Sequence, residues 1–405
     1  MRFAVSSSSK ACSGNGRARA GVLYPGSGGA SASIETPSLL ISTRKGLPTF
    51  MSRDLMASLP LPHSRLLHVS PLNFVECPSM KTISSIGGLH QMLGLQDFFF
   101  VASARDSVQS LPESGATNKL GASFETPSGR RLVKPSDYME MICSLKPNLW
   151  ASLADEVPAW VSEKRNKASV DRTIRWLDDC LSLDEAGGTS ILGSIVGGSN
   201  IEERKRCAIE AAMRNVSGFW IGGFGQGESM EERPALLNIV TDSLPKEKLR
   251  YVSGLALPEE VLQGVAAGID LFDSTYIYHL TLGGFALIFP LDILENNSAN
   301  QQHSDIGSDC TKINLRATIY RKDTSPIVDN CTCFTCKNHT RAYINHLLNV
   351  HEMLAQILLE IHNTRHYMGF FQSIREAIKC GKFDTFRQNF IDGRRAHITS
   401  AAVCL

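Results

Sequence analysis

Short apolar runs alternate with segments of helical periodicity between residues 130 and 275. The apolar runs are expected strands, and they are Leu149–Leu153, Ser190–Val196, Gly218–Ile221, Tyr251–Leu255 and Ile269–Phe272. Helices are predicted from Pro135 onward, around Val170–Leu181, and at 200–214, 230–243 and 257–267. Strands that alternate with helices of about 10 to 15 residues form parallel βαβ units. A closed barrel is the natural outcome of this alternation.

Cys331, Cys333 and Cys336 form a Cys-x-Cys-x-x-Cys cluster. Three thiolates and one imidazole are the soft ligands of a closed tetrahedral Zn²⁺ site, and this spacing lets one sharp turn present all three sulfurs to one ion. We therefore expect a structural zinc site. The alternative, three incidental cysteines in a reduced protein, leaves unexplained why three of the eleven cysteines fall so close together.

The residues alone leave the fourth ligand open, because His339, His346, His351 and His362 all follow the cluster. His339 and His362 are the main rivals. His339 is the nearer of the two in sequence. A continuous helix rises about 1.5 Å per residue and would carry His362 roughly 40 Å away. Polar residues near Asn349 separate two helical stripes, however, at Ala342–Leu348 and Met353–Ile361. A helical hairpin would return His362 toward the cysteines.

Segments along most of the chain carry a family resemblance. The strongest are Cys331–Cys336, Asn338–Leu348 and His362-Asn363, and weaker ones in the same order are Gly16–Leu23, Ile34–Pro37, Phe124–Gly129, Ala154–Pro158, Ile221–Phe224 and Gly268–Asp273. Together they resemble the tRNA-guanine transglycosylases. The resemblance implies an α/β fold, a (β/α)8 TIM-type barrel with an inserted zinc-binding helical subdomain. It also implies that one Zn²⁺ is bound by Cys331, Cys333, Cys336 and His362.

We expect four parts in the chain. Residues 1–290 would form the barrel with N-terminal β-segments, 291–325 a polar insertion and connection, 326–392 the zinc-binding subdomain with C-terminal helices, and 393–405 a loose tail. The polar stretch 296–308 is rich in Asn, Gln and Ser, as mobile insertions are. The first 33 residues have the Ser, Ala and Arg content of a transit peptide. We favour a structural role for them, because the family-like β-hairpin already begins at Arg17.

Two aspartates match family residues with a chemical role. Base exchange at a nucleoside C1′ requires a carboxylate nucleophile, an acid/base group and hydrogen-bond partners for the purine edge. By resemblance, Asp273 matches the nucleophile and Asp155 matches the base-recognition aspartate. Each of them would serve equally well as a structural residue at a strand end.

The rest of the family's active-site machinery is missing. Its Asp-Ser-Gly-Gly-Phe-Gln general-base loop has Arg105–Ser110 as nearest analogue, which lacks the glycines. Its Gln-Gly-Gly strand end is replaced by Val196-Gly-Gly198. Its arginine-bearing loop after the nucleophile is replaced by Tyr276–Gly284, which has no guanidinium for bidentate contacts with phosphate or guanine. We expect no active catalytic residue.

The resemblance therefore implies a non-catalytic subunit. A homologous catalytic subunit, its partner in a heterodimer, would exchange guanine for queuine at wobble position 34 of tRNAs with GUN anticodons, those for Asp, Asn, His and Tyr. The present chain would help to orient the tRNA. One alternative is an active tRNA-guanine transglycosylase with Asp273 as nucleophile and Asp106 as base. Another is a zinc-stabilised RNA-binding scaffold.

Composition limits the partners and the compartment. A formal net charge of +1 argues against nucleic-acid binding through overall charge and leaves room for a local basic patch, such as Lys337, Arg341, Arg365 and Arg375 on the helical hairpin. Eleven cysteines without a secretory signal or an apolar stretch of about 18 residues favour a cytosolic, reduced protein with no integral membrane association. Peripheral association with the mitochondrial outer membrane stays open.

Overall fold

The computed structural model describes residues 2–6, 16–24, 33–106, 108, 110–184, 191–291 and 311–403, with side chains of the last helix described as far as Arg394. The chain divides into two compact units. Unit 1 comprises residues 1–47 and 65–275, and unit 2 comprises residues 48–64 and 276–405. None of the described helices combines the length and apolarity needed to cross a membrane.

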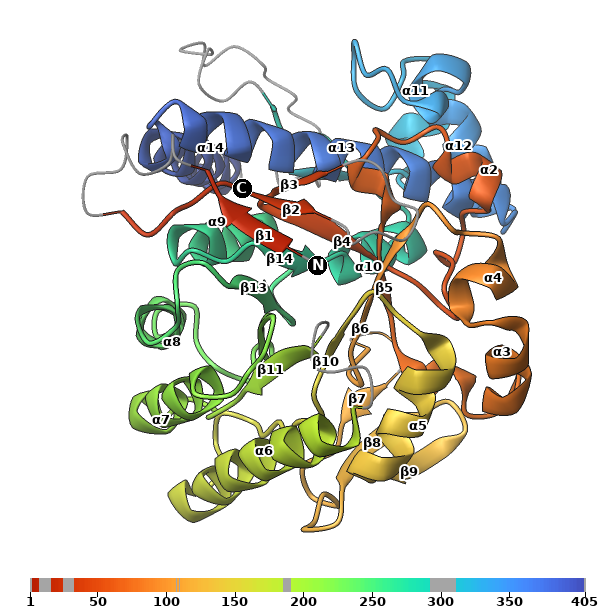
Figure 1. Ribbon diagram of the computed structural model, residues 1–405. Helices are drawn as coiled ribbons and strands as arrows, with labels where there is room; N and C mark the ends of the chain where they lie inside the picture. The colour runs from red at the N-terminus through yellow and green to blue at the C-terminus, as the bar shows by residue number, and fades with distance from the viewer. Residues whose placement is uncertain are drawn as a thin grey trace. The chain divides into compact units, whose positions relative to one another are not determined.

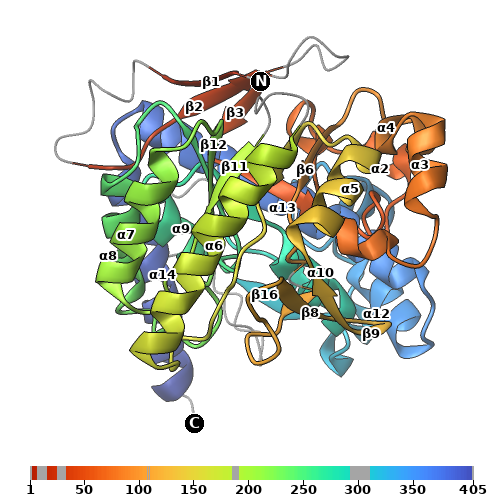
Figure 2. The ribbon, with the colours of Figure 1, turned by 60° about the horizontal axis from the view of Figure 1, so that its bottom comes forward.

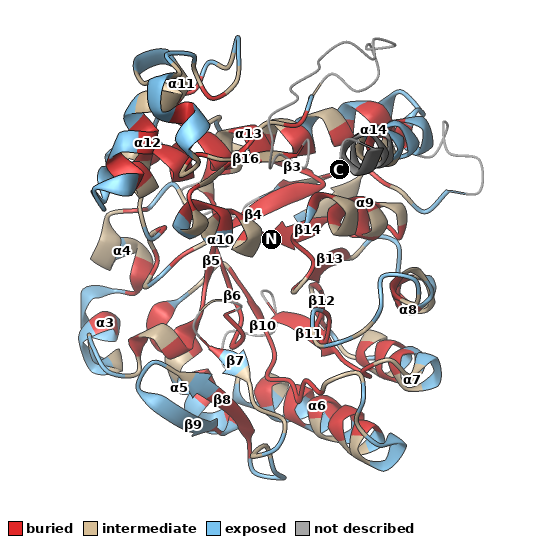
Figure 3. Ribbon diagram, turned by 180° about the vertical axis from the view of Figure 1, so that it is seen from behind, coloured by how far each residue is buried: buried red, intermediate tan, exposed pale blue. Residues whose placement is uncertain are grey.

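Unit 1 is built on a closed barrel of eight parallel strands (Figure 1). In chain order the strands are β4 (Ser38–Ser42), β5 (Leu66–Val69), β6 (Phe99–Ala102), β10 (Leu149–Ala151), β11 (Ile191–Ile195), β12 (Gly218–Ile221), β13 (Leu249–Val252) and β14 (Leu271–Asp273). Pairing of β14 with β4 closes the barrel. The strands are buried on both faces (Figure 3), because side chains fill the interior and helices cover the outside. The predicted barrel is confirmed.

Helices surround these strands (Figure 2). They are α3 (Met80–Ile86), α4 (Leu89–Leu93), α5 (Pro135–Leu145), α6 (Glu163–Leu183), α7 (Ile201–Ala212), α8 (Arg233–Asp242) and α9 (Pro258–Ala266), with the 3-10 turn η2 (Pro71–Phe74). Their first turns carry the expected signals. Proline opens α5 and α9, and the side chain of Ser162 caps α6. All the helices and strands predicted between residues 130 and 275 are present, although Ser190 lies outside the described residues.

Two antiparallel sheets are added to unit 1. The first comprises β1 (Arg2–Val5), β2 (Gly21–Tyr24) and β3 (Ile34–Thr36), so the N-terminal β-structure starts earlier than the predicted Arg17. Arg19 binds Asp270 and the carbonyl oxygens of Lys246 and Lys248, which precede β14 and β13. This sheet therefore lies at the N-terminal end of the barrel. The second sheet, β7 (Leu111–Pro112), β8 (Ala122–Thr126) and β9 (Gly129–Val133), lies between β6 and α5 in the chain.

Unit 2 is mainly helical. Its elements are α2 (Arg53–Met56), α10 (Thr275–Gly283, which starts at the unit boundary), β15 (Phe285–Leu287), β16 (Lys312–Asn314), α11 (Phe334–Asn338), α12 (Arg341–Asn349), α13 (Leu354–Lys379) and α14 (Phe383–Val403), with the 3-10 turns η1 (His63–Arg65) and η3 (Thr318–Lys322). One apolar core joins β15, β16, η3, α12 and the first part of α13. Ile313, Tyr320, Ile344 and Leu358 are among its buried members.

The structure differs from some of the expectations for this part of the chain. The polar stretch 296–308 lies outside the described residues. Part of the expected connection 291–325 is regular, since β16 pairs antiparallel with β15. The tail expected to be loose from Gly393 is helical as far as Val403. No proline interrupts it, and buried Phe383, Phe386 and Phe390 anchor the start of this helix.

Candidate metal centre and barrel pocket

The structure brings Cys331, Cys333, Cys336 and His362 together in unit 2. Their ligand atoms all lie within 4.8 Å of one another. His362 Nδ1 is 4.0 Å from the Sγ of Cys331, 3.6 Å from that of Cys333 and 3.3 Å from that of Cys336. Bond lengths in tetrahedral zinc sites imply sulfur-to-nitrogen distances of about 3.6 Å. The group thus has the spacing of four ligands around one metal ion.

Local structure positions the three sulfurs. Cys333 is the N-cap of α11, and its Sγ accepts a hydrogen bond from the backbone N–H of Cys336 at 3.2 Å. The hydroxyl of Thr335, between them, donates to the carbonyl oxygen of Leu358 in α13. The first turn of α11 is therefore tied to the helix that carries His362.

The hairpin that delivers the histidine has its bend where the sequence predicts it. Helix α12 ends at Asn349, and His351 adopts a φ of 60° before α13 begins at Leu354. His339, the other candidate ligand, is outside the group. Its ring stacks on Tyr343 with a centroid separation of 5.3 Å.

His362 and Asn363 both form hydrogen bonds with strand β15. Nε2 of His362 lies 2.8 Å from the carbonyl oxygen of Leu287, which leaves Nδ1 to face the sulfurs. The amide of Asn363 accepts from the N–H of Leu287 and donates to the oxygen of Phe285. A carbonyl partner of this kind fixes the tautomer and orientation of a metal-binding histidine.

Protonation of the group is coupled to metal binding. Contact with Cys333 lowers the pKa of the Cys331 thiol, which favours the thiolate. Burial opposes the charged imidazolium of His362, but contacts with Cys331 and Cys333 outweigh it and raise the pKa to about 9. At neutral pH a proton therefore competes with a metal ion for Nδ1.

We expect metal affinity to rise with pH as a result. Because only the neutral imidazole binds, this one group should increase the apparent affinity about tenfold per pH unit between about pH 6 and pH 8. Competition between the protein and a chromophoric chelator for Zn²⁺ measures it. An affinity that does not change over this range would contradict the assignment of Nδ1.

The four residues named as a local basic patch on the helical hairpin divide into two groups. Arg341 donates to the carbonyl oxygens of Pro326 and Ile327 and pairs with Asp323. Arg375 is 4 % exposed. Both side chains are thus used inside unit 2, whereas Lys337 and Arg365 lie nearer to solvent.

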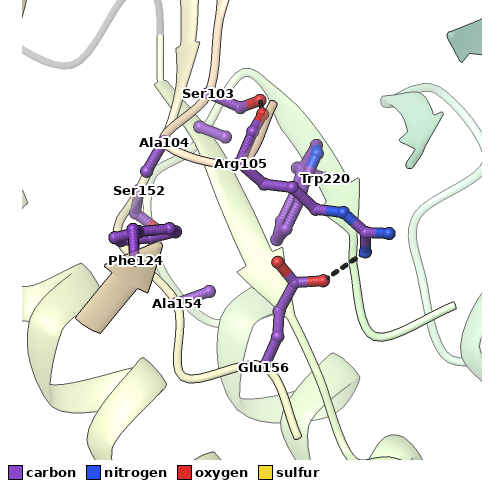
Figure 4. Close-up of a pocket in the computed structure, with 9 residues that line it drawn as sticks. Ser103, Ala104, Arg105, Phe124, Ser152, Ala154, Glu156 and Trp220 are labelled. Atoms are coloured by element: carbon purple, nitrogen blue, oxygen red, sulfur yellow. Dashed lines mark hydrogen bonds and ion pairs between the residues drawn. The ribbon is translucent and has the colours of Figure 1, made fainter. Parts of the chain in front are cut away.

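A second candidate site is a cavity at the C-terminal end of the barrel in unit 1 (Figure 4). It has an empty volume of about 200 Å³. Its lining comes from the segments after β6 and β10, from β8 and from β12: Ser103, Ala104, Arg105, Phe124, Ala151, Ser152, Ala154, Glu156 and Trp220. This end is where TIM barrels carry their active sites.

A buried ion pair spans this cavity. Nη1 of Arg105 donates to Oε2 of Glu156 at 2.7 Å, and Nη2 donates to the carbonyl oxygen of Phe224 at 3.0 Å. The same carboxylate oxygen accepts from the backbone N–H of Gly223 and the amide of Gln226. The guanidinium and carboxylate are 5 % and 2 % exposed. Although burial opposes the charge, Glu156 raises the pKa of Arg105, so the guanidinium is retained as a cation.

Asp155, the match to the base-recognition aspartate, is not part of the cavity lining. Its carboxylate receives two hydrogen bonds from Arg165, at 2.7 and 2.8 Å, and one from Arg172 at 3.0 Å. Both arginines belong to α6. Asp155 thus fastens the segment after β10 to the helix behind it.

Asp273, the match to the nucleophile, ends strand β14 and is 3 % exposed. Its Oδ2 accepts from the N–H of Gly254 at 3.0 Å and its Oδ1 from the N–H of Thr275 at 3.1 Å. Asp106 is likewise engaged, by the N–H of Val108 and the amide of Asn73. The carboxylates of Asp273 and Asp106 thus both accept hydrogen bonds from groups of the protein itself.

The two glycine pairs that follow β11 and β12 are tied together by Arg204. This buried side chain donates to the carbonyl oxygens of Gly198, Gly222 and Gly223, and its guanidinium lies 4.1 Å from the centre of the Phe224 ring. A Cβ at Gly197 would lie 2.7 Å from the backbone nitrogen of Arg204. Close packing against Arg204 thus explains why glycine is used here.

Sequence reasoning missed Arg105 and Glu156 as residues of the pocket. Glu156 stands next to Asp155, and Arg105 stands next to Asp106, so each is adjacent to an aspartate with a predicted role. The signal that could have identified them is a pair of opposite charges, an arginine and a glutamate, in two loops at the same end of the barrel.

Comparison with known proteins adds an independent finding. The model of the family described as "Queuine tRNA-ribosyltransferase" matches residues 12–396. Similar proteins include three named "Queuine tRNA-ribosyltransferase accessory subunit 2". That of Xenopus tropicalis is 33 % identical over 400 residues, which cover 92 % of this chain and 96 % of the relative. That of Homo sapiens is 36 % identical over 371 residues, which cover 81 % of this chain and 88 % of the relative. That of Danio rerio is 32 % identical over 397 residues, which cover 90 % of this chain and 93 % of the relative.

Proposed function

The chain belongs to the queuine tRNA-ribosyltransferase family, and on that premise we propose that it is the accessory, non-catalytic subunit of such an enzyme. A homologous catalytic subunit would be its partner in a heterodimer. The pair would exchange guanine for queuine at position 34 of tRNAs with GUN anticodons. The names of the relatives support this function, since "accessory subunit" implies a separate catalytic chain.

The observation that carries the non-catalytic assignment is the state of the barrel pocket. The two charged residues of the cavity, Arg105 and Glu156, are paired with each other, and the Glu156 carboxylate also accepts hydrogen bonds from Gly223 and Gln226. Asp273, the residue matched to the nucleophile, accepts hydrogen bonds from two backbone amides.

We infer that the metal ion of unit 2 is zinc, one per subunit. Three thiolates and an imidazole favour Zn²⁺ over oxygen-preferring cations, and the 3.3–4.0 Å spacing from Nδ1 to the sulfurs fits a tetrahedral ion. Four protein ligands leave no position for water or substrate. Zinc bound here would therefore supply cross-linking between α11 and α13 and no catalytic chemistry.

Two further features support a partner and a compartment. Large apolar side chains are exposed on unit 2, among them Phe334, Tyr343, Val350 and Met353, which are 44 %, 39 %, 50 % and 64 % exposed. Such surfaces often mark protein contacts, and we infer that the catalytic subunit covers part of them. None of the eight described cysteines forms a disulfide with another described residue, which supports our inference of a cytoplasmic protein.

Guanine exchange in three reactions tests the proposal. This chain alone and the catalytic chain alone should release little labelled guanine from tRNA, and the mixture should be active. Co-purification should recover both chains at near-equal stoichiometry. Brisk exchange by this chain alone, or a covalent RNA adduct that disappears in Asp273→Asn, would favour the active-enzyme alternative. If no catalytic homologue associates, the scaffold alternative is favoured.

A further inference from the structure

The guanidinium of Arg105 occupies the barrel pocket in the manner of a bound ligand. Its side chain enters from the loop after β6 and reaches the Glu156 carboxylate (Figure 4). The other end of the guanidinium donates to the carbonyl oxygen of Phe224, and Trp220 is also part of the pocket lining. Nε of Arg105 is buried and has no hydrogen-bond partner. The pocket thus satisfies the terminal nitrogens of a planar cation and leaves the stem nitrogen unpaired.

The Glu156 carboxylate and the Trp220 ring both have contacts that do not involve this guanidinium. Oε2 of Glu156 is held by the Gly223 N–H at 2.6 Å and by Gln226 at 3.2 Å. Indole Nε1 of Trp220 donates to the hydroxyl of Ser253 at 2.9 Å. A Cβ at Gly222 would lie 2.4 Å from Trp220 and 3.0 Å from Glu156, so backbone packs closely behind both. We therefore expect Glu156 and Trp220 to keep their positions when the Arg105 side chain is removed.

A carboxylate beside a carbonyl oxygen and an aromatic ring suits one class of ligand. Planar groups with adjacent N–H donors, such as guanidinium or the amino-lactam edge of a 2-amino-oxopurine, present donors in the geometry that a carboxylate accepts. A flat ring or cation also has a favourable contact with the face of an indole.

We propose that Arg105 is an internal ligand that closes a site for planar amidine-type donors, and that its removal opens this site to free ligands of that class. The native chain consequently does not take up a free purine base. This inference deepens the proposed function, since it names what fills the pocket of a subunit that performs no base exchange.

Ligand binding to variants tests the inference. We expect Arg105→Ala to melt at a lower temperature than the native chain, because Glu156 loses its buried cation. Methylguanidine at about 10 mM should raise that temperature by about 3 °C or more. Methylammonium has the same charge but lacks the planar pair of N–H donors, so it should not raise the melting temperature. Guanine should bind Arg105→Ala and not the native chain in equilibrium dialysis.

Two matched variants separate the pocket from nonspecific effects. Arg105→Met fills the space with a side chain that has no N–H donors, and Arg105→Ala/Glu156→Gln opens the space without the carboxylate. Neither should respond to methylguanidine. If Arg105→Ala is not recovered folded, refolding with methylguanidine should rescue it only when Glu156 is present.

Several results would overturn the inference. They are guanine binding by the native chain, a folded Arg105→Ala that ignores methylguanidine, equal responses from all variants, and a failure of methylguanidine to rescue refolding. These outcomes are distinct from failure of the proposed function, which is measured by guanine exchange in the native chain without any variant.

Discussion

Cys333→Ser should release the metal ion from unit 2 and lower the stability of that unit by about 4 kcal/mol, a fall of about 10 °C in melting temperature. Cys333 is 2 % exposed, caps α11 and accepts the N–H of Cys336. A serine hydroxyl is a poor ligand for zinc, so the link between α11 and α13 would be lost. The loss is smaller than the roughly 10 kcal/mol or more of a zinc finger because the apolar core of unit 2 remains.

Elemental analysis and hydrogen exchange check this result. Metal content should fall from one per chain toward zero, and protection should decrease in α11, α12 and the first turns of α13. Cys380→Ser is the matched control. Cys380 is exposed at the end of α13, outside the metal group, so this change should alter stability by no more than about 0.5 kcal/mol. Retention of one metal ion and native melting in Cys333→Ser would show that the cluster is not a metal centre.

Periodicity predicted the barrel because its signal is local. Each strand from β10 to β14 is a short apolar run, and each helix between them has a stripe such as Val170, Ile174 and Leu177. The helical hairpin of unit 2 was predictable for the same reason, since polar residues interrupt the stripe where α12 ends. Strand β1 was missed because four residues without turn signals depend on a distant partner, β2.

The pocket was harder to predict, because the sequence does not show which of two neighbouring side chains faces the cavity. Asp155 and Glu156 follow β10, and their carboxylates have different partners: Asp155 binds Arg165 of α6, whereas Glu156 binds Arg105 in the cavity. A match at Asp155 therefore cannot tell which of the two acids reaches the cavity, and the structure gives that position to Glu156. The contacts of Arg105 are with residues 51 and 119 positions away. Local patterns carry no record of such pairs.

Gly254→Ala should lower the free energy of unfolding of unit 1 by about 4 kcal/mol. Gly254 has a φ of +88°, and an added Cβ would lie 2.2 Å from the carbonyl oxygen of Phe224 and 2.9 Å from Nη2 of Arg105. Its N–H also donates to Asp273. The left-handed conformation costs an alanine about 1 kcal/mol, and forcing the two loops apart adds roughly 3 kcal/mol.

Gly129→Ala isolates the conformational part of that loss. Gly129 has a φ of +96°, but an added Cβ there meets nothing within 4 Å, so we expect a loss of about 1 kcal/mol. Urea unfolding of both variants measures the difference, which reports how tightly the loops after β12 and β13 pack. Equal losses would mean that the loop at Gly254 yields to a methyl group. The carbonyl of Phe224 would then be free to move away from Arg105, and the pocket would be less firmly closed than its contacts indicate.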